Sequence, residues 1–197
     1  MTVAAALLAA GRGSRLGAES TAKPLLELSG RRLVDWALDA AITAETRPVL
    51  LVVGHAADVV AATAPPSVQV VVAPDWRLGI AHSLRAALDA LEPDPAVDAV
   101  CVGLADQPRV GPDAYRRLVA AHQHGATLAV ATYAGQRANP VLLDRSLWPE
   151  ARTLRGDTGA RALMSTHTVT EVDCTGTGDP TDVDTLDDLR ALEGRTE

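Results

Sequence analysis

One loop near the start of the chain combines flexible backbone with positive charge. Within the stretch LLAAGRGSRLGAESTAKPLL, the residues of interest are Gly11, Gly13, Gly17, Arg12, Arg15 and Lys23. Glycine allows the backbone to approach an anion closely, and the cationic side chains supply charge. A flexible surface loop with solvated arginines is the plainer alternative. The position of the loop directly after an expected strand favours a phosphate site.

The loop does not match two well-known phosphate-binding motifs. A P-loop needs Gly-Lys-Ser/Thr, whereas Gly17 is followed by Ala18. The dinucleotide motif G-x-G-x-x-G needs a third glycine where this chain has Leu16. This spacing disfavours a dinucleotide-dependent oxidoreductase.

Two aspartates are candidate metal ligands. Asp106 follows an expected strand in GLADQPRV, and it stands too far from the helix that begins near Gly111 to be a good cap. Asp184 lies in DPTDVDTLDDL, just before the last expected helix, where we interpret Asp187 and Asp188 as helix-capping residues. Magnesium needs only one or two protein carboxylates when phosphates and water complete its shell. We therefore expect Asp106 and Asp184 to bind Mg²⁺.

Two further stretches have polar residues suited to substrate binding. The residues are Gly79, His82 and Ser83 in APDWRLGIAHSLRAAL, and Asn139, Pro140, Gly156 and Asp157 in RANPVLL and RGDTGARALM. The first group suits hydrogen bonds to a base or sugar, and an ordinary helix start explains it equally well. The second group either caps turns or faces an acceptor substrate.

The pattern of apolar runs predicts the elements that position these residues. Strands are expected at 3–9, 48–54, 68–73, 97–104 and 126–132, and helices at 31–43, 55–63, 79–91 and 111–124. Continuous apolar runs suit strands that are buried on both faces of a parallel sheet. The alternation predicts a three-layer α/β/α sandwich with a Rossmann-like, mostly parallel sheet. Ligands bind beyond the carboxyl ends of such strands.

The rhythm changes after residue 132. The segment 133–164 is rich in turn residues, and we interpret it as an insertion that folds over one edge of the sheet. A strand at 166–174 and a closing helix at 185–194 follow. The length of 197 residues suits a single domain over 1–197.

Composition excludes several classes of protein. The net charge of −7 disfavours a nucleic-acid partner, which needs a basic face. Cys101 and Cys174 are far apart and have no CxxC spacing, so neither a disulfide framework nor a structural zinc site is indicated. No segment is typical of a leader or a membrane span, and a cytoplasmic protein without a membrane partner is expected.

The order of the motifs closely resembles that of the MobA-like nucleotidyltransferases. The matching segments are LAAGRGSRLG…KPLLELSGRRLVDWAL, GIAHSLRAAL, LADQP, NPVLL, GDTGARAL and DVDTLDDL, and they cover almost the whole chain. The resemblance is greatest to the molybdenum-cofactor cytidylyltransferase branch. It implies the fold of the nucleotide-diphospho-sugar transferases.

The resemblance also implies roles for individual residues. The nucleotide-binding residues are Ala9, Ala10, Gly11, Gly13, Arg15, Lys23, Gly54, Gly79 and Ser83. Arg15, Lys23 and Asp106 are the implied catalytic residues, and Asp106 and Asp184 are the implied magnesium ligands. Asn139, Pro140 and Asp157, within the 133–164 segment, are the implied acceptor-binding residues.

The implied reaction moves CMP from CTP to a phosphorylated acceptor, the molybdenum-pterin cofactor, and releases pyrophosphate. Ala9-Ala10-Gly11 favours CTP, because GTP users often have Ala-Gly-Gly there. A molybdoenzyme or its chaperone is the implied protein partner.

Other functions stay open. They are a GTP-dependent guanylyltransferase, a sugar-phosphate or phospholactate nucleotidyltransferase, and an inactive nucleotide-binding partner of a molybdoenzyme. The acceptor is open because the chain has Ala138-Asn139-Pro140 where cytidylyltransferases often have Gly-His-Pro.

Overall fold

The computed structural model describes residues 1–13 and 22–194. The predicted phosphate-binding residue Arg15, and Gly17 of the same loop, lie outside the described residues. Their roles stay predictions.

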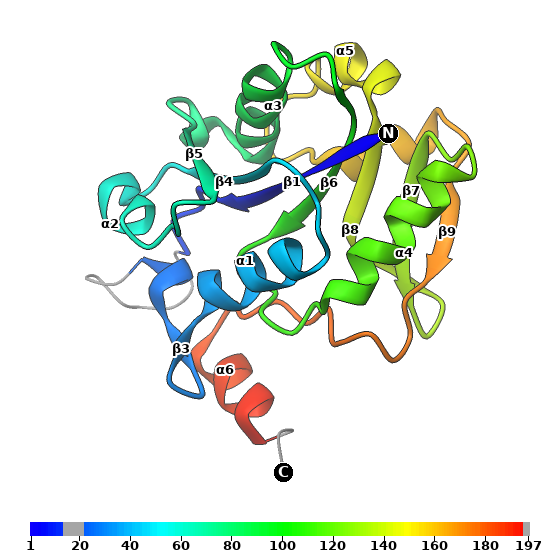
Figure 1. The fold of residues 1–197 in the computed structure, drawn as a ribbon. Coiled ribbons are helices and arrows are strands. Elements are labelled where there is room, and N and C mark those ends of the chain that lie inside the picture. The colour runs from blue at the N-terminus through cyan, green and yellow to red at the C-terminus, as the bar shows by residue number, and fades with distance from the viewer. Residues whose placement is uncertain (14–21, 195–197) are drawn as a thin grey trace.

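A seven-stranded sheet runs through the middle of the described residues (Figure 1). Its strands are β1 (Thr2–Ala9), β4 (Val49–Val53), β5 (Val68–Val72), β6 (Val97–Leu104), β7 (Leu128–Tyr133), β8 (Gln136–Asp144) and β9 (Thr170–Asp173). The strand order is β5-β4-β1-β6-β8-β7-β9, and all pairs are parallel except those of β8 with β6 and β7. A separate two-stranded antiparallel sheet joins β2 (Glu27–Leu28) to β3 (Arg31–Arg32).

Helices cover both faces of the large sheet, as the alternation of elements predicts. The α-helices are α1 (Leu33–Thr43), α2 (Ala57–Ala61), α3 (Ile80–Leu91), α4 (Pro112–Gln123), α5 (Trp148–Ala151) and α6 (Leu186–Glu193). Short 3₁₀ helices span Lys23–Leu25, Trp76–Leu78, Arg145–Leu147 and Ala160–Ser165. Within the described ranges, no helix is both long and apolar enough to cross a membrane.

The core explains why β1 is apolar at nearly every position. Val3, Ala5 and Leu7 pack in one cluster with α1 and α4, whereas Ala4 and Ala6 pack in another with α3 and α5. Because successive side chains of a strand point to opposite faces, a strand between two helical layers needs apolar residues throughout. The expected three-layer α/β/α sandwich is confirmed.

The segment 133–164 is not simply an insertion over one edge of the sheet. Its first part forms β8, which lies inside the sheet between β6 and β7 and runs antiparallel to both. Pro140 indicated a turn in the sequence because proline removes a ladder hydrogen bond. In the structure the register of β7 and β8 shifts at Val130/Ala131, which pair with Val141 and Ala138, so the irregularity accommodates Asn139 and Pro140.

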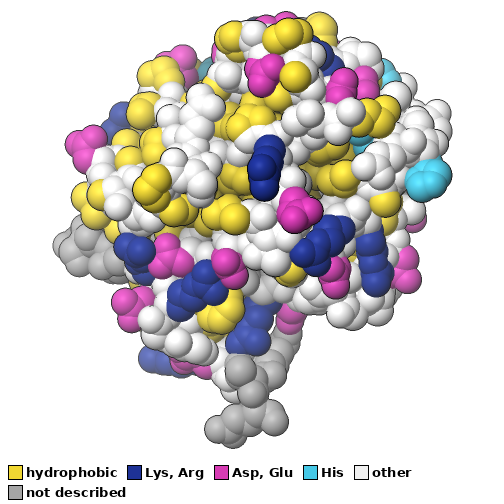
Figure 2. Space-filling model, viewed as in Figure 1, with side chains coloured by type: hydrophobic (Ala, Val, Ile, Leu, Met, Phe, Trp, Pro, Cys, Tyr) yellow, Lys and Arg dark blue, Asp and Glu magenta, His cyan; other side chains and the backbone are white. Residues whose placement is uncertain are grey.

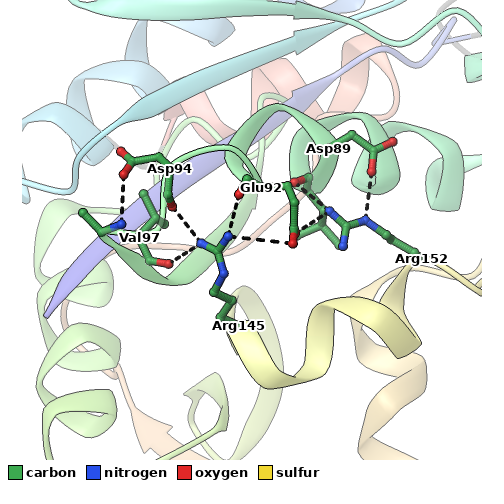
Figure 3. A network of polar contacts seen from close by, with 8 residues as sticks. Asp89, Glu92, Asp94, Val97, Arg145 and Arg152 are labelled. Atoms are coloured by element: carbon green, nitrogen blue, oxygen red, sulfur yellow. Dashed lines mark hydrogen bonds and ion pairs between the residues drawn. The ribbon is translucent and has the colours of Figure 1, made fainter.

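Two arginines hold the remainder of that segment against α3 and the turn between α3 and β6 (Figure 3). Arg145 donates to the backbone carbonyls of Asp94 and Val97, both at 2.8 Å. Arg152 donates to Asp89 Oδ1 at 2.8 Å and to Glu92 Oε2 at 2.7 Å. These contacts hold α5 and its flanking turns on one face of the sheet.

The C-terminal helix α6 packs on the small sheet. Leu28 and Leu33 form a third apolar cluster with Val183 and Leu192. Thr185 and Asp188 form a reciprocal capping box at the start of α6, which confirms the capping role predicted for Asp188. This packing brings the segment that carries Asp184 back towards the large sheet.

Candidate active site

Lys23 joins the two predicted metal ligands into one cluster. Its Nζ donates to Asp106 Oδ2 at 2.5 Å and to Asp184 Oδ1 at 2.7 Å. Only 8% of Lys23 is exposed. Three residues that are widely separated in the sequence therefore meet in one cluster, which brings the two predicted cation ligands together with the predicted phosphate-binding lysine.

Backbone hydrogen bonds fix the two carboxylates at the carboxyl edge of the sheet. The N–H of Ala105 donates to the carbonyl of Leu8 at 3.1 Å, which continues the β1–β6 pairing just past the end of β6. The N–H of Val183 donates to the carbonyl of Asp106 at 2.9 Å. Asp106 and Asp184 are thus placed by main-chain geometry rather than by side-chain contacts alone.

The electrostatics of the cluster favour a charged lysine. Burial by itself lowers the pKa of Lys23, but its ion pairs and hydrogen bonds with Asp106 and Asp184 outweigh that effect and raise its pKa above the ordinary value. The neighbouring carboxyl of Asp182 has a raised pKa, because of burial first and then the charges of Asp106 and Asp184. The site therefore concentrates negative charge around one ammonium group.

A cavity of about 240 Å³ opens over this cluster. It is lined by Leu8, Ala9, Gly11, Gly13, Lys23, Pro24, Ala105, Asp106 and Asp184. Gly13 has φ of +63°, and a Cβ at this position would lie 2.7 Å from Lys23 Cβ. Glycine is therefore needed here both for the backbone conformation and for the close packing against Lys23.

A second cavity of about 310 Å³ lies beside the first. It is lined by Leu8, Ala10, Gly11, Arg12, Trp76, Arg77, Gly79, Ile80, Ser83, Leu104, Asp106 and Asp157. Leu8, Gly11 and Asp106 line both cavities, so the two form neighbouring parts of one cleft. One part is lined by glycine and charged groups, whereas the other has an aromatic and aliphatic wall.

All but one of the predicted nucleotide residues that the structure describes line the cleft. Ala9, Gly11, Gly13 and Lys23 line the first cavity, and Ala10, Gly11, Gly79 and Ser83 line the second. Gly54 lines neither cavity. A Cβ at Gly54 would lie 2.5 Å from Trp76 Cγ, so this glycine makes room for the tryptophan that does line the cleft.

The predicted acceptor residues are divided in the structure. Asn139 Nδ2 donates to Gln107 Oε1 at 3.0 Å, one residue beyond Asp106, and Pro140 is buried in β8. Neither lines the two cavities. Asp157, by contrast, lines the second cavity together with the predicted nucleotide residues Gly79 and Ser83.

A close backbone approach explains the position of Asp157. The N–H of Ala81 donates to the carbonyl of Gly156 at 3.1 Å. Gly79 has φ of +110°, and a Cβ there would overlap the backbone of Gly156. The start of α3 and the 156–157 turn are therefore packed main chain against main chain.

Trp76 is a cleft residue that the motif analysis missed. Its ring lies 5.5 Å from the ring of His55, and the guanidinium carbon of Arg77 lies 4.6 Å from its centroid. The sequence feature that could have identified it is its position three residues before Gly79, but an isolated tryptophan is more often a core residue. Only the fold places it beside the loop after β1.

The exposed charges on one face of the molecule are mixed (Figure 2). Acidic and basic side chains alternate over that face, without a continuous basic area in this view.

The fold and the site define a nucleotidyltransferase-type domain: a mostly parallel sheet with a glycine-lined cleft at its carboxyl edge, where one lysine meets two aspartates. The chain belongs to the family of the MobA-like NTP transferase domains, whose model matches residues 5–172. The family resemblance read from the motifs is thus confirmed.

Similar proteins extend over nearly the whole chain. Nicotine blue oxidoreductase of Paenarthrobacter nicotinovorans is 32% identical over 201 residues, which cover 96% of each protein. The crystal structure of Rv0371c from Mycobacterium tuberculosis H37Rv has a TM-score of 0.86 and 34% identity, and covers 98% of both chains. A complex of Rv0371c with manganese has a TM-score of 0.82 and 32% identity, and covers 98% of this chain and 99% of that one.

Proposed function

We propose that this protein transfers CMP from CTP to the phosphate of an acceptor, the molybdenum-pterin cofactor, and releases pyrophosphate. The observation that carries the proposal is the Lys23 ammonium held between Asp106 and Asp184 at a glycine-lined cavity. Family membership supports transfer of a nucleotidyl group. The choice of CTP and of the pterin rests on the motif resemblance.

Asp106 and Asp184 fit a divalent cation, and we propose Mg²⁺. Asp106 Oδ1 is buried and has no hydrogen-bond partner, so this oxygen is available to a ligand. The described residues hold no group of three or more His, Cys, Asp and Glu suited to a metal, which fits an ion that takes its other ligands from phosphates and water. The manganese complex of Rv0371c supports a divalent cation in this family.

The proposed reaction needs no protein nucleophile. A phosphate oxygen of the acceptor attacks the α-phosphorus, a new P–O bond forms, and the bond to pyrophosphate breaks. The acceptor phosphate is already ionised at neutral pH, so no general base is required. Lys23 stabilises the charge that develops on the α-phosphate, and a bound divalent cation would offset charge on the same phosphates.

The cleft suggests how the nucleotide is divided between its two parts. We place the triphosphate in the first cavity, beside Lys23, and the base in the second, against Trp76 and Ile80. Arg15 is proposed to hold the leaving pyrophosphate. Asn139, linked to Gln107 beside Asp106, is proposed to lie near the acceptor.

The name of one relative favours a second candidate function. Nicotine blue oxidoreductase is 32% identical to this chain along 96% of its length, so an oxidoreductase acting on nicotine blue is the alternative. The absence of G-x-G-x-x-G in the opening loop weighs against a dinucleotide cofactor.

The decisive experiment measures pyrophosphate release with each of the four ribonucleoside triphosphates, with and without molybdenum-loaded pterin. We expect release that requires CTP, pterin and Mg²⁺ together. Sugar 1-phosphates and phospholactate serve as competing acceptors, and activity with one of them alone would identify that nucleotidyltransferase instead.

Two outcomes would contradict the proposed nucleotidyl transfer. Reduction of nicotine blue by NADH or NADPH, without pyrophosphate release from any triphosphate, would favour the oxidoreductase. Tight binding of CTP without either reaction would favour an inactive nucleotide-binding partner of a molybdoenzyme.

A further inference from the structure

Two polar side chains that line the second cavity form no hydrogen bond with the described residues. Ser83 is only 4% exposed, yet it lines the cavity and its hydroxyl makes no hydrogen bond with the described residues. Asp157 lines the same cavity as an exposed residue, and its carboxylate forms no hydrogen bond or ion pair with them. A ligand in the cavity can therefore reach both the Ser83 hydroxyl and the Asp157 carboxylate without displacing a protein partner.

The other walls of this cavity suit a flat ring. Trp76, Ile80 and Leu104 supply apolar surface. The Trp76 side chain packs against the backbone of Gly54 and near the ring of His55. Aromatic and apolar side chains are the usual wall for a nucleobase, while a few polar groups select among bases. The cavity therefore has a separate recognition element, which is the carboxylate of Asp157.

The backbone that carries this carboxylate is anchored by main-chain contacts. The carbonyl of Gly156 accepts a hydrogen bond from Ala81 at the start of α3, and Gly79 permits the two backbones to touch. A ligand that binds this carboxylate does not have to order the backbone that carries it. Asp157 is thus suited to discriminate between ligands.

We infer that Asp157 is a specificity-determining residue that selects a base with an exocyclic amino group, cytosine, against uracil. This inference rests on the proposed use of a nucleoside triphosphate. An ionised carboxylate only accepts hydrogen bonds, and it accepts one from the N4 amino group of cytosine. Uracil has a carbonyl oxygen at the corresponding position, so the same carboxylate would face an acceptor and repel it.

The inferred role differs from the one that the motifs imply for Asp157. The resemblance puts Asp157 with Asn139 on the acceptor side, whereas the structure puts it in one cavity with Gly79 and Ser83. The two roles, recognition of the base and binding of the acceptor, predict different results in a binding experiment. Only the former changes the choice among triphosphates when no acceptor is present.

The test compares binding of CTP and UTP by calorimetry, with Mg²⁺ and without acceptor, in the wild type and in Asp157→Asn. Asparagine keeps the shape but adds a donor that uracil O4 can use. We expect the wild type to prefer CTP, and the CTP/UTP affinity ratio to fall by about tenfold to a hundredfold in the variant. Asp75→Asn, an exposed carboxylate outside the cavity, is the charge-matched control and should leave the ratio unchanged.

The outcomes separate this inference from the proposed function. Equal affinity of the wild type for CTP and UTP, or an unchanged ratio in Asp157→Asn, overturns the role of Asp157 while nucleotide binding stands. A wild type that binds none of the four triphosphates overturns both. Asp157→Ser is the second variant: it should bind CTP and UTP with a similarly reduced ratio, and a retained preference for CTP would contradict the inference.

Discussion

Two groups of ion pairs in this protein both join basic side chains to carboxylates, but they differ in burial and in the partners of the basic side chain. Around Arg145 and Arg152, each guanidinium also donates to backbone carbonyls, and the carboxylates of Asp89 and Glu92 are more than half exposed (Figure 3). At the cleft, Lys23 is 8% exposed and its hydrogen bonds go to two carboxylates. The first group joins segments of chain, whereas the second surrounds a cavity.

The choice of cation follows this difference. Lys23 is the only lysine in the sequence, and the other 17 of the 18 basic residues are arginines. The planar guanidinium of arginine suits fixed, multiple contacts, whereas the compact ammonium of lysine can change partners. Moreover, Asp106 Oδ1 is buried without a hydrogen-bond partner, which leaves the cleft group incomplete until a ligand binds. The cleft group, in which one buried carboxylate oxygen has no hydrogen-bond partner, is therefore the better candidate for a ligand-binding site.

The largest effect is expected at Asp106. Asp106→Asn should lower the rate of pyrophosphate release by about a thousandfold, because the amide is a poor ligand for the proposed cation. Circular dichroism and the melting temperature should stay close to those of the wild type. Asp89→Asn, in the arginine group, is the control and should retain activity. A comparable loss of activity in both variants would contradict the view that only the cleft group takes part in the reaction.

Loss of the ammonium should be nearly as damaging to the rate. Lys23→Met keeps the length of the side chain but removes its charge, and we expect kcat to fall by about a hundredfold with a smaller change in the KM for CTP. Steady-state kinetics separates the two parameters. A change in KM alone would mean that Lys23 only binds the nucleotide.

The same variant should bind a divalent cation more tightly. In the free protein the ammonium is paired with both carboxylates, so a cation must compete with it for them. We expect Lys23→Met to bind Mn²⁺ about tenfold more tightly than the wild type, as measured by electron paramagnetic resonance without nucleotide. Weaker binding in the variant would show that the ammonium does not compete, and Arg152→Met should not alter the affinity.

The smallest effect is expected in the arginine group, on stability alone. Arg152→Met should lower the melting temperature by about 2–4 °C at neutral pH, without loss of activity. Its hydrogen bond to Glu92 lowers the pKa of that carboxyl from the ordinary 4.5 in the folded state. The stabilisation is therefore present above the unfolded pKa and is lost as the pH falls through the folded pKa.

A pH series tests the sign of this effect. The difference in melting temperature between wild type and Arg152→Met should be constant at neutral pH and should shrink as the pH falls below the ordinary pKa of 4.5 and Glu92 becomes protonated. A difference that grows on acidification would contradict the assignment.

The sequence by itself determined the layers of the fold and identified the residue types that line the candidate site. Residues 4–7 of β1 are fully buried because helices pack on both faces, and this burial is what an unbroken apolar run predicts. Lys23, Asp106 and Asp184 could be singled out because each follows an apolar strand or precedes a capped helix. These are short-range signals, readable within a few residues.

Only the tertiary structure decided which of these residues meet. Lys23 lies 83 residues from Asp106 and 161 from Asp184, and no local pattern reports such distances. The same holds for β8, whose turn-like Pro140 is accommodated by a register irregularity with β7, and for Asp157, which Gly79 draws into the second cavity. Local propensity reflects the conformational preferences of neighbouring residues, whereas strand pairing and backbone approach depend on contacts that form when distant segments pack.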